Sequence, residues 1–271
     1  MEINYPQIDW ITLTSWSAED FLRWKDWQNK QSGEMKDGKI QMYSGFWVGS
    51  AFIGQGTQLN KNHYIARISG DKSSNVIHDL WSDGVKATRI DVQITKEFPE
   101  NYSARKFVDC LRSGDWGTYK RDLQLIENSD GLDTVYIGSR KTERFARMYV
   151  KSSLEGKFLR FEVEYKGEWA NIISREYIKN YTVLSAVLFD FINSLPLDDQ
   201  GVLQGFLDLI SDVRSGIVVP RRVVPDENTY SWLIEQVGPV IWRYLNDHDR
   251  GADLANFLIK LIYDSGAGKT E

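Results

Sequence analysis

Three segments of this chain alternate between apolar and ionisable residues, and this alternation most constrains the fold. They read ATRIDVQI (87–94), FARMYVK (145–151) and LRFEVEYK (159–166). Because successive side chains of a β-strand point to opposite faces of a sheet, each segment predicts a strand with one apolar and one charged face. The apolar faces need cover. The pattern therefore predicts an α+β fold: an antiparallel sheet with helices on one face and a charged active-site face.

The predicted secondary structure changes after about residue 172. Before it, apolar periodicity predicts further strands and helices around the three segments. After it, the chain predicts helices almost throughout, at 176–194, 198–214, 228–247 and 250–263. We therefore predict an α+β domain over residues 1–175 and a helical C-terminal region over 176–271, which would serve DNA binding or oligomerisation.

Composition excludes several classes of protein. The single cysteine, Cys110, rules out a disulfide framework and a cysteine-rich zinc site. The chain has neither a leader-like N-terminus nor an apolar run of about 18 residues, the length that a transmembrane helix needs. We therefore expect a cytoplasmic protein without a membrane partner.

Positive charge is concentrated locally although the formal net charge is −5. The segment from Arg140 to Lys166 holds eight Lys and Arg residues against four Glu residues. Salt screens exposed charges beyond about 10 Å, so the local distribution matters more than the total. This segment is the predicted site for a negatively charged partner.

The charged faces of the three predicted strands carry a consistent set of side chains. Carboxylates at Asp91, Glu162 and Glu164 without a nearby His or Cys suit a hard cation such as Mg²⁺ or Mn²⁺. Arg147 and Lys151 flank Tyr149 at two positions on either side, and such cations suit phosphate oxygens. The competing interpretation is that these are the solvated outer faces of an ordinary antiparallel sheet.

A tyrosine in such surroundings is a candidate nucleophile. Its reference pKa of about 10 means that it needs activation at neutral pH. We expect the flanking cations and a bound metal to stabilise the phenolate of Tyr149 and the charge that develops on an attacked phosphodiester.

The segments YIGSRKTERFARMYVK (136–151), RFEVEYK (160–166) and TRIDVQI (88–94) together resemble the replication initiation factor family, Rep_trans. Its members are rolling-circle replication initiators of plasmids and filamentous phages, and related relaxases of conjugative elements. The resemblance covers roughly residues 85–170. It implies a metal-dependent endonuclease that makes a site-specific single-strand nick in DNA and rejoins the strand.

The resemblance also implies roles for particular residues. Tyr149 would attack the strand to give a 5′-phosphotyrosine and a 3′-OH, and Asp91 and Glu162 would bind the metal. Tyr136 lies in the same motif and is the alternative nucleophile. Family members often carry a second acid four residues after the first, where this chain has Thr95; Glu164 is the candidate replacement. The cations expected to contact DNA are Arg140, Lys141, Arg144 and Arg160.

The expected partners are an origin hairpin or single-stranded DNA, a host helicase or polymerase, and a second copy of the chain in a homodimer. Two alternatives to the endonuclease remain open. The first is a catalytically inactive DNA-binding or regulatory protein of a mobile element with the same fold. The second is a sheet protein whose charged faces are merely solvated.

Overall fold

The computed structural model describes residues 5–57, 61–70, 73–116, 121–154, 156–196 and 201–210. The chain divides into two compact units, Met1–Val219 and Pro220–Glu271, and every described residue belongs to the first. The helices predicted at 228–247 and 250–263 lie outside the described residues. The roles predicted for the two regions of the chain stay predictions.

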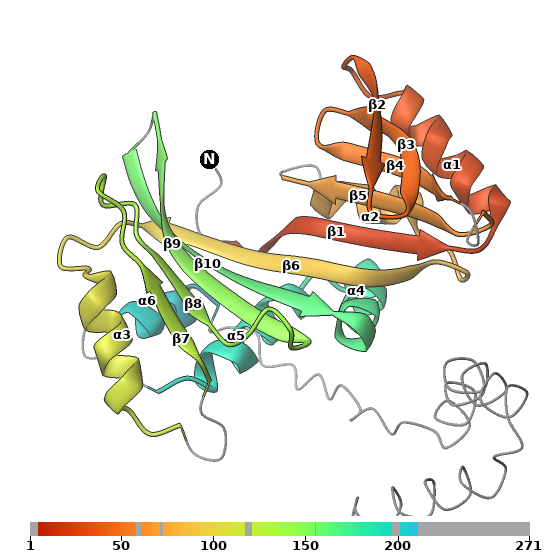
Figure 1. Cartoon of the computed structure of the whole chain (residues 1–271). Coiled ribbons are helices and arrows are strands. Elements are labelled where there is room, and N and C mark those ends of the chain that lie inside the picture. The colour runs from red at the N-terminus through yellow and green to blue at the C-terminus, as the bar shows by residue number, and fades with distance from the viewer. Residues whose placement is uncertain are drawn as a thin grey trace, which may run out of the picture. The chain divides into compact units, whose positions relative to one another are not determined.

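One antiparallel sheet of ten strands organises the described residues, in the order β2-β3-β4-β5-β1-β6-β10-β9-β8-β7 (Figure 1). The strands are β1 (Gln7–Ser15), β2 (Met35–Ile40), β3 (Tyr43–Val48), β4 (Ala51–Gly56), β5 (Tyr64–Ser69), β6 (Lys86–Glu97), β7 (Leu123–Ile126), β8 (Thr134–Ile137), β9 (Arg144–Ser153) and β10 (Gly156–Lys166). The three alternating segments of the sequence are the neighbouring strands β6, β10 and β9. The predicted α+β class and antiparallel sheet are confirmed.

Helices cover one face of this sheet. They are α1 (Ala18–Asn29), α2 (Ser73–Leu80), α3 (Ala104–Ser113), α4 (Gly167–Lys179), α5 (Val183–Asn193) and α6 (Val202–Ile210). Figure 1 shows α3 to α6 below the strands β6 to β10, with the opposite face left open. No helix in the described ranges is long and apolar enough to cross a membrane.

The apolar halves of the alternating strands form the core against these helices. Ile90, Val92 and Ile94 of β6 are fully buried. Phe161 of β10 packs between Phe191 of α5 and Phe206 of α6, with ring centroids 6.1 and 5.7 Å apart. Helices α5 and α6 therefore pack on the sheet, and residue 175, the predicted domain boundary, lies inside α4.

The strands β2 to β5 form one end of the sheet, here called the wing. Gly38, Gly45 and Gly54 pair across three of its strands, so this row of the sheet carries no side chains. A Cβ atom on Gly45 would lie 2.0 Å from the carbonyl oxygen of Ile53, so the pairing requires glycine there. The ring of Trp47 occupies the space that a Cβ on Gly38 would need. The glycine row thus lets aromatic rings lie close to the backbone on the open face.

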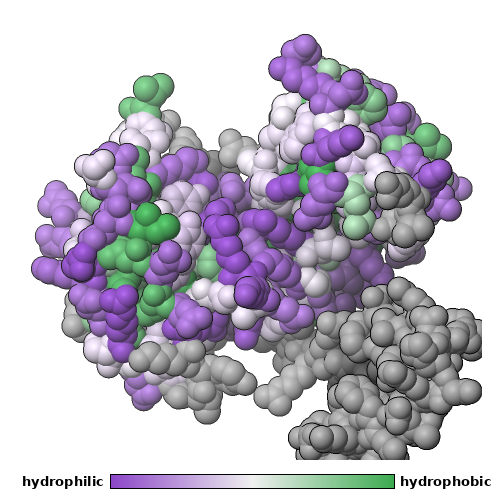
Figure 2. All heavy atoms as spheres, viewed as in Figure 1, coloured by the Kyte–Doolittle hydropathy of each residue, from purple (hydrophilic) through white to green (hydrophobic). Residues whose placement is uncertain are grey.

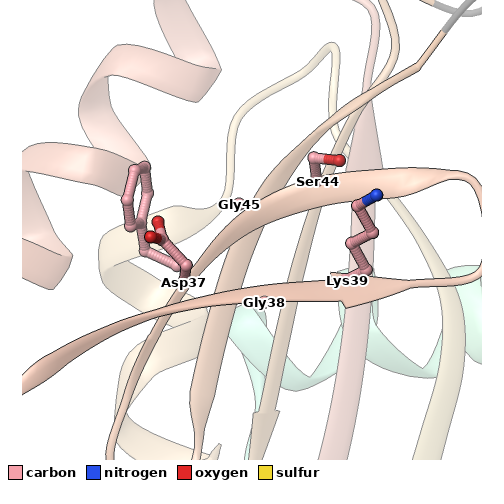
Figure 3. A pocket seen from close by; sticks show the side chains of 6 residues that line it. Asp37, Gly38, Lys39, Ser44 and Gly45 are labelled. Carbon is pink, nitrogen blue, oxygen red and sulfur yellow. The ribbon is translucent and has the colours of Figure 1, made fainter.

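A shallow hollow of about 500 Å³ lies between β2 and β3 (Figure 3). Its lining consists of Asp37, Gly38, Lys39, Ser44, Gly45 and Phe46. The charged side chains alternate with glycine along β2, an edge strand of the sheet. Charges on an edge strand discourage pairing with another chain, which accounts for this hollow without a ligand.

Two features of the fold differ from the sequence prediction. Strands β2 and β7 were not predicted, because the polar MKDGKI and the short LQLI carry too weak a period to distinguish them from loops. The helix predicted at 176–194 is two helices, since the backbone of Asn180 is extended and ends α4.

Candidate active site

The polar halves of β6, β10 and β9 meet on the open face of the sheet. Asp91 pairs with Glu164 and Gln93 with Glu162 between β6 and β10. Glu162 pairs in turn with Arg147 of β9. Figure 2 shows mainly hydrophilic residues on the surface between the wing and the opposite end of the sheet. The register therefore brings the predicted acids and cations into one patch.

Tyr149 lies at the centre of this patch. Its hydroxyl donates a hydrogen bond of 3.3 Å to Glu162 Oε2. Arg160 Nη1 lies 3.5 Å from the same hydroxyl and 3.5 Å from Asp9 Oδ1. The guanidinium groups of Arg147 and Arg160 lie 5.7 and 6.0 Å from the centroid of the tyrosine ring. A phenol, carboxylates and guanidinium groups thus surround one point on the sheet.

Each acid that the sequence singled out is paired with a cation. Arg89 forms two hydrogen bonds to Asp91, of 2.7 and 2.5 Å, and a salt bridge of 2.8 Å to Glu164. Arg147 pairs with Glu162 and lies 4.0 Å from Asp91. The buried carboxylates are therefore neutralised by guanidinium groups that rise from the same face, as buried charges require.

Burial governs the acidity of the candidate nucleophile. Desolvation, followed by the negative charge of Glu162, raises the pKa of Tyr149 to about 12, against the lowering effect of Arg160 and Arg147. The sequence led us to expect cations that stabilise the phenolate. Instead the described protein groups favour the neutral phenol, because burial of the hydroxyl and the negative charge of Glu162 outweigh the effects of Arg160 and Arg147. Tyr149 therefore needs a base or a bound cation before it can attack.

Asp91 has a raised pKa that predicts a pH effect on stability. Desolvation outweighs the hydrogen bonds from Arg89 and raises its pKa from 3.8 to about 7. An acid with a raised pKa in the folded state stabilises the fold most below its unfolded pKa, and loses that contribution as pH rises through the folded value. We expect the stability of the wild type relative to Asp91→Asn to fall between about pH 4 and 7. Urea unfolding of both proteins across this range measures it, and a constant difference would contradict it.

The predicted metal ligands do not form a cation cage as they stand. Among the described residues, no group of three or more His, Cys, Asp and Glu side chains lies suitably to hold a metal ion. Arg89 and Arg147 occupy the space between the carboxylates of Asp91, Glu162 and Glu164. Another oxygen lies beside them: the buried Gln93 Oε1 has no hydrogen-bond partner among the described residues. It neighbours Glu162 across the strands.

Asp9 and Gln93 are site residues that the sequence analysis missed. Asp9 lies at a bulge where the pairing of β1 with β6 shifts between Ile8 and Trp10. Strict alternation would place Asp9 on the face opposite Trp10, but the extra residue brings Asp9 to the charged patch beside Arg160. The two apolar residues Ile8 and Ile11, three positions apart and both buried, were the available signal.

Thr95 stands where the related family often carries a second acid, and the structure gives it another role. It is buried and accepts a hydrogen bond of 3.1 Å from Arg160 Nε. This bond holds the guanidinium group of Arg160 in the direction of Tyr149 and Asp9. Thr95 thus positions a cation rather than contributing a negative charge.

The other predicted cations are divided between the two faces. Lys151 shares the open face, and its charge acts on the carboxyl of Asp9. Arg140 lies over the rings of Tyr136 and Phe145, at 5.4 and 5.5 Å from their centroids, at the β8–β9 side of the patch. Lys141 is exposed in the loop before β9.

Arg144 and Tyr136 do not join the centre of the patch. The guanidinium of Arg144 lies 4.6 Å from the ring centroid of Trp169 in α4, on the helix-covered face. Its position three residues before Arg147 puts it on the opposite side of the strand. The ring of Tyr136 stacks on Phe145, with centroids 5.5 Å apart. Of the two candidate nucleophiles, Tyr149 is the one whose hydroxyl contacts Glu162 and Arg160.

The described residues form an α+β fold whose antiparallel sheet carries a half-buried phenol among acids and arginines on its open face. Comparison with solved structures finds this fold in the rolling circle replication initiator protein from Geobacillus stearothermophilus. The two share 13% sequence identity and a TM-score of 0.57 over 76% of this chain and 95% of that one. The likeness establishes the shared fold.

A second structure, DynU16, a putative protein in the dynemicin biosynthetic locus, aligns over 65% of this chain and 96% of that one at 12% identity. Its TM-score of 0.22 is too low to support a conclusion. No protein-family model and no curated protein matches the chain.

Proposed function

We propose that this protein is a rolling-circle replication initiator or relaxase that nicks one DNA strand with Tyr149 and later rejoins it. One observation carries the proposal: the Tyr149 hydroxyl contacts both a carboxylate, Glu162, and a guanidinium, Arg160, on the open face. The fold shared with a rolling circle replication initiator supports it. Membership of the replication initiation factor family, inferred from the sequence motifs, belongs to the same proposal.

The contacts support a chemical role for each group in the proposed reaction. Glu162 takes the phenol proton as the Tyr149 oxygen attacks the phosphorus atom, and the bond from phosphorus to the 3′ oxygen breaks. The proton passes back from Glu162 to the departing oxygen, which becomes the 3′-OH, and the 5′ end remains as a phosphotyrosine. Arg147, Arg160 and Lys151 stabilise the negative charge on the phosphorane. Arg140 and Lys141 hold neighbouring phosphates of the strand.

A divalent cation, Mg²⁺ or Mn²⁺, is part of the proposal. Glu162 from the predicted set, with Asp9 and Gln93 Oε1, which no described residue pairs, offers oxygen ligands of the kind such ions prefer. A bound ion would supply positive charge that lowers the pKa of the phenol and polarises the phosphate. Asp91 and Glu164 remain candidate ligands once their ion pairs with Arg89 open.

A second candidate function is binding or regulation at DNA without cleavage. The raised pKa of Tyr149 and the pairing of the three predicted acids with arginines and lysine favour it, because they are also what a charged face without catalysis requires. A homodimer and a host helicase or polymerase are proposed partners under either function.

Nicking of supercoiled plasmids tests the proposal. Supercoiled plasmids that carry the DNA on both sides of the gene, including any hairpin-forming sequence in it, are incubated with the full chain and Mg²⁺ or Mn²⁺. We expect conversion to open circles, a protein–DNA adduct at the 5′ end and loss of both with a chelator. Sequence-specific binding without an adduct would support the regulatory function. DNA binding whose affinity does not change with salt concentration would contradict both functions, because both need contacts to phosphates.

A further inference from the structure

The open face continues from Tyr149 onto β1 and the wing, where cations and aromatic rings alternate. Arg67 of β5 and Arg89 of β6 lie on the ring of Trp10, with guanidinium carbons 4.1 and 4.7 Å from its centroid. In the register, Phe52 lies opposite Arg67, which lies opposite Thr12, and Thr12 lies opposite Arg89. This cross-strand row links the wing to the acids beside Tyr149.

Arg67 differs from the arginines of the central patch because no carboxylate pairs with it in the part of the chain that the structure describes. Its Nε atom is buried and lacks a hydrogen-bond partner there. Desolvation, followed by the positive charge of Arg89, lowers the pKa of the Arg67 guanidinium, and the negative charge of Asp91 offsets this only in part. An unsatisfied, partly desolvated guanidinium favours an anionic oxygen from outside the chain.

The ring of Trp16 supplies a second contact on the same face. Trp16 directly follows β1, and its neighbour His63 is bonded to Tyr43, which belongs to the small apolar cluster on the open face of the wing. Trp16 is 67% exposed, and its ring lies 4.4 Å from that of His63, which is fixed by a 2.5 Å hydrogen bond to Tyr43. An exposed aromatic ring with one face open to solvent can stack on a nucleic-acid base.

Rigid packing in the wing keeps these groups in place. Tyr43, Phe52 and Ile65 form a small buried cluster on the open face of the wing, with Trp47 against it. The cluster depends on the glycine row, which lets the ring of Trp47 lie over Gly38. The centroids of the Trp47 and Phe52 rings are 5.2 Å apart. The wing therefore presents preformed groups, as a binding surface of low entropic cost requires.

We propose that the open face of the wing and the adjoining end of β1 bind the single-stranded DNA that flanks the nick, with a phosphate on Arg67 and a base stacked on Trp16. This inference rests on the proposed function, and it extends the site from Tyr149 across β6 and β1. Strands β5 and β9 are four positions apart in the sheet, a span of about 19 Å at about 4.8 Å per strand, which several nucleotides cover. Interleaved cations and aromatic rings are the usual means of binding a strand without reading its sequence.

Binding of labelled oligothymidylate of about 16 nucleotides, the upper range for single-strand sites, tests the two contacts separately. Fluorescence anisotropy of the full chain is measured against salt, with an abasic oligonucleotide of equal length as the second probe. We expect Arg67→Ala to weaken both probes and to reduce the salt slope by about 0.7, the value for one phosphate of a single strand. Arg67→Lys should restore most of the slope.

Trp16→Ala is expected to weaken oligothymidylate by about tenfold and to leave the abasic probe unchanged, because stacking needs a base. The controls are Arg112→Ala and Tyr181→Ala, which remove an exposed cation and an exposed ring from outside the open face. The inference would be overturned if Arg67→Ala and Trp16→Ala lost no more affinity than the controls. It would also be overturned if Trp16→Ala weakened binding of both probes equally. Such a result would leave nicking by Tyr149 untouched, since the nicking assay is read independently.

Discussion

Replacing Tyr149 with phenylalanine is expected to abolish nicking and covalent attachment to DNA. The change removes the hydroxyl that contacts Glu162 and Arg160 and retains the ring that lies beside Arg147. Because the nucleophile is lost, the rate should fall by about 10³-fold or more, as for other nucleophile deletions. The rates come from the plasmid assay, and the adduct is detected by the shift of the protein in a denaturing gel.

Tyr136→Phe is the matched control for this experiment. Its ring stacks on Phe145 at the side of the patch, so the loss of its hydroxyl should change nicking by less than about threefold, well short of a nucleophile's loss. Binding of oligonucleotides should survive in both variants, because the cations remain. Equal nicking by Tyr149→Phe and the wild type would exclude Tyr149, and a loss confined to Tyr136→Phe would move the nucleophile to the neighbouring strand.

The second large effect is expected from the Arg147–Glu162 pair. Glu162 is only 1% exposed, so Arg147→Met leaves a buried carboxylate without its cation. Breaking such a pair from one side costs about 3–5 kcal/mol, and we expect the lower part of that range because the Arg147 side chain is 31% exposed. Urea unfolding gives the free energy of unfolding, with Arg105→Met as control. Arg105 pairs with Glu127 on the surface, where solvent screens both charges, so its replacement should change the free energy of unfolding far less.

The double variant Arg147→Met, Glu162→Gln separates folding from chemistry. Removing both charges should return most of the lost stability, because no buried charge remains unpaired. Nicking should not return, since the base and the phosphate-binding guanidinium are both missing, and losses of about 10²- to 10⁴-fold are typical for a general base alone. Restored nicking would show that the pair is purely structural.

Much of the fold could be predicted from the alternation of three strands. The apolar positions of β6, β9 and β10 are buried as expected, and the open face carries the predicted tyrosine and acids. Strand β2 could not be predicted, because MKDGKI is stabilised by pairing with β3 rather than by any apolar period of its own. Asp9 was missed for a similar reason: a bulge, which depends on the partner strand, changed its face.

The chemistry of the site followed the sequence in its residue types and departed from it in its balance of charge. Flanking positions predicted that Arg147 and Lys151 would acidify Tyr149. In the fold, burial raises the pKa of the Tyr149 hydroxyl, and Glu162 from the adjacent strand adds to that effect. The distances between strands depend on register, which local spacing does not contain.

The sequence by itself determined which side chains share a strand face, because the period of a β-strand is fixed by backbone geometry. It therefore determined that a tyrosine, carboxylates and cations would stand on the face that no helix covers. Only the tertiary structure decided which acid meets which arginine, and that Gln93 Oε1 and Arg67 Nε are buried without a hydrogen-bond partner among the described residues. Those outcomes depend on the pairing of β6 with both β1 and β10, which lie far apart in the sequence, and the interactions that fix them arise only once the sheet has formed.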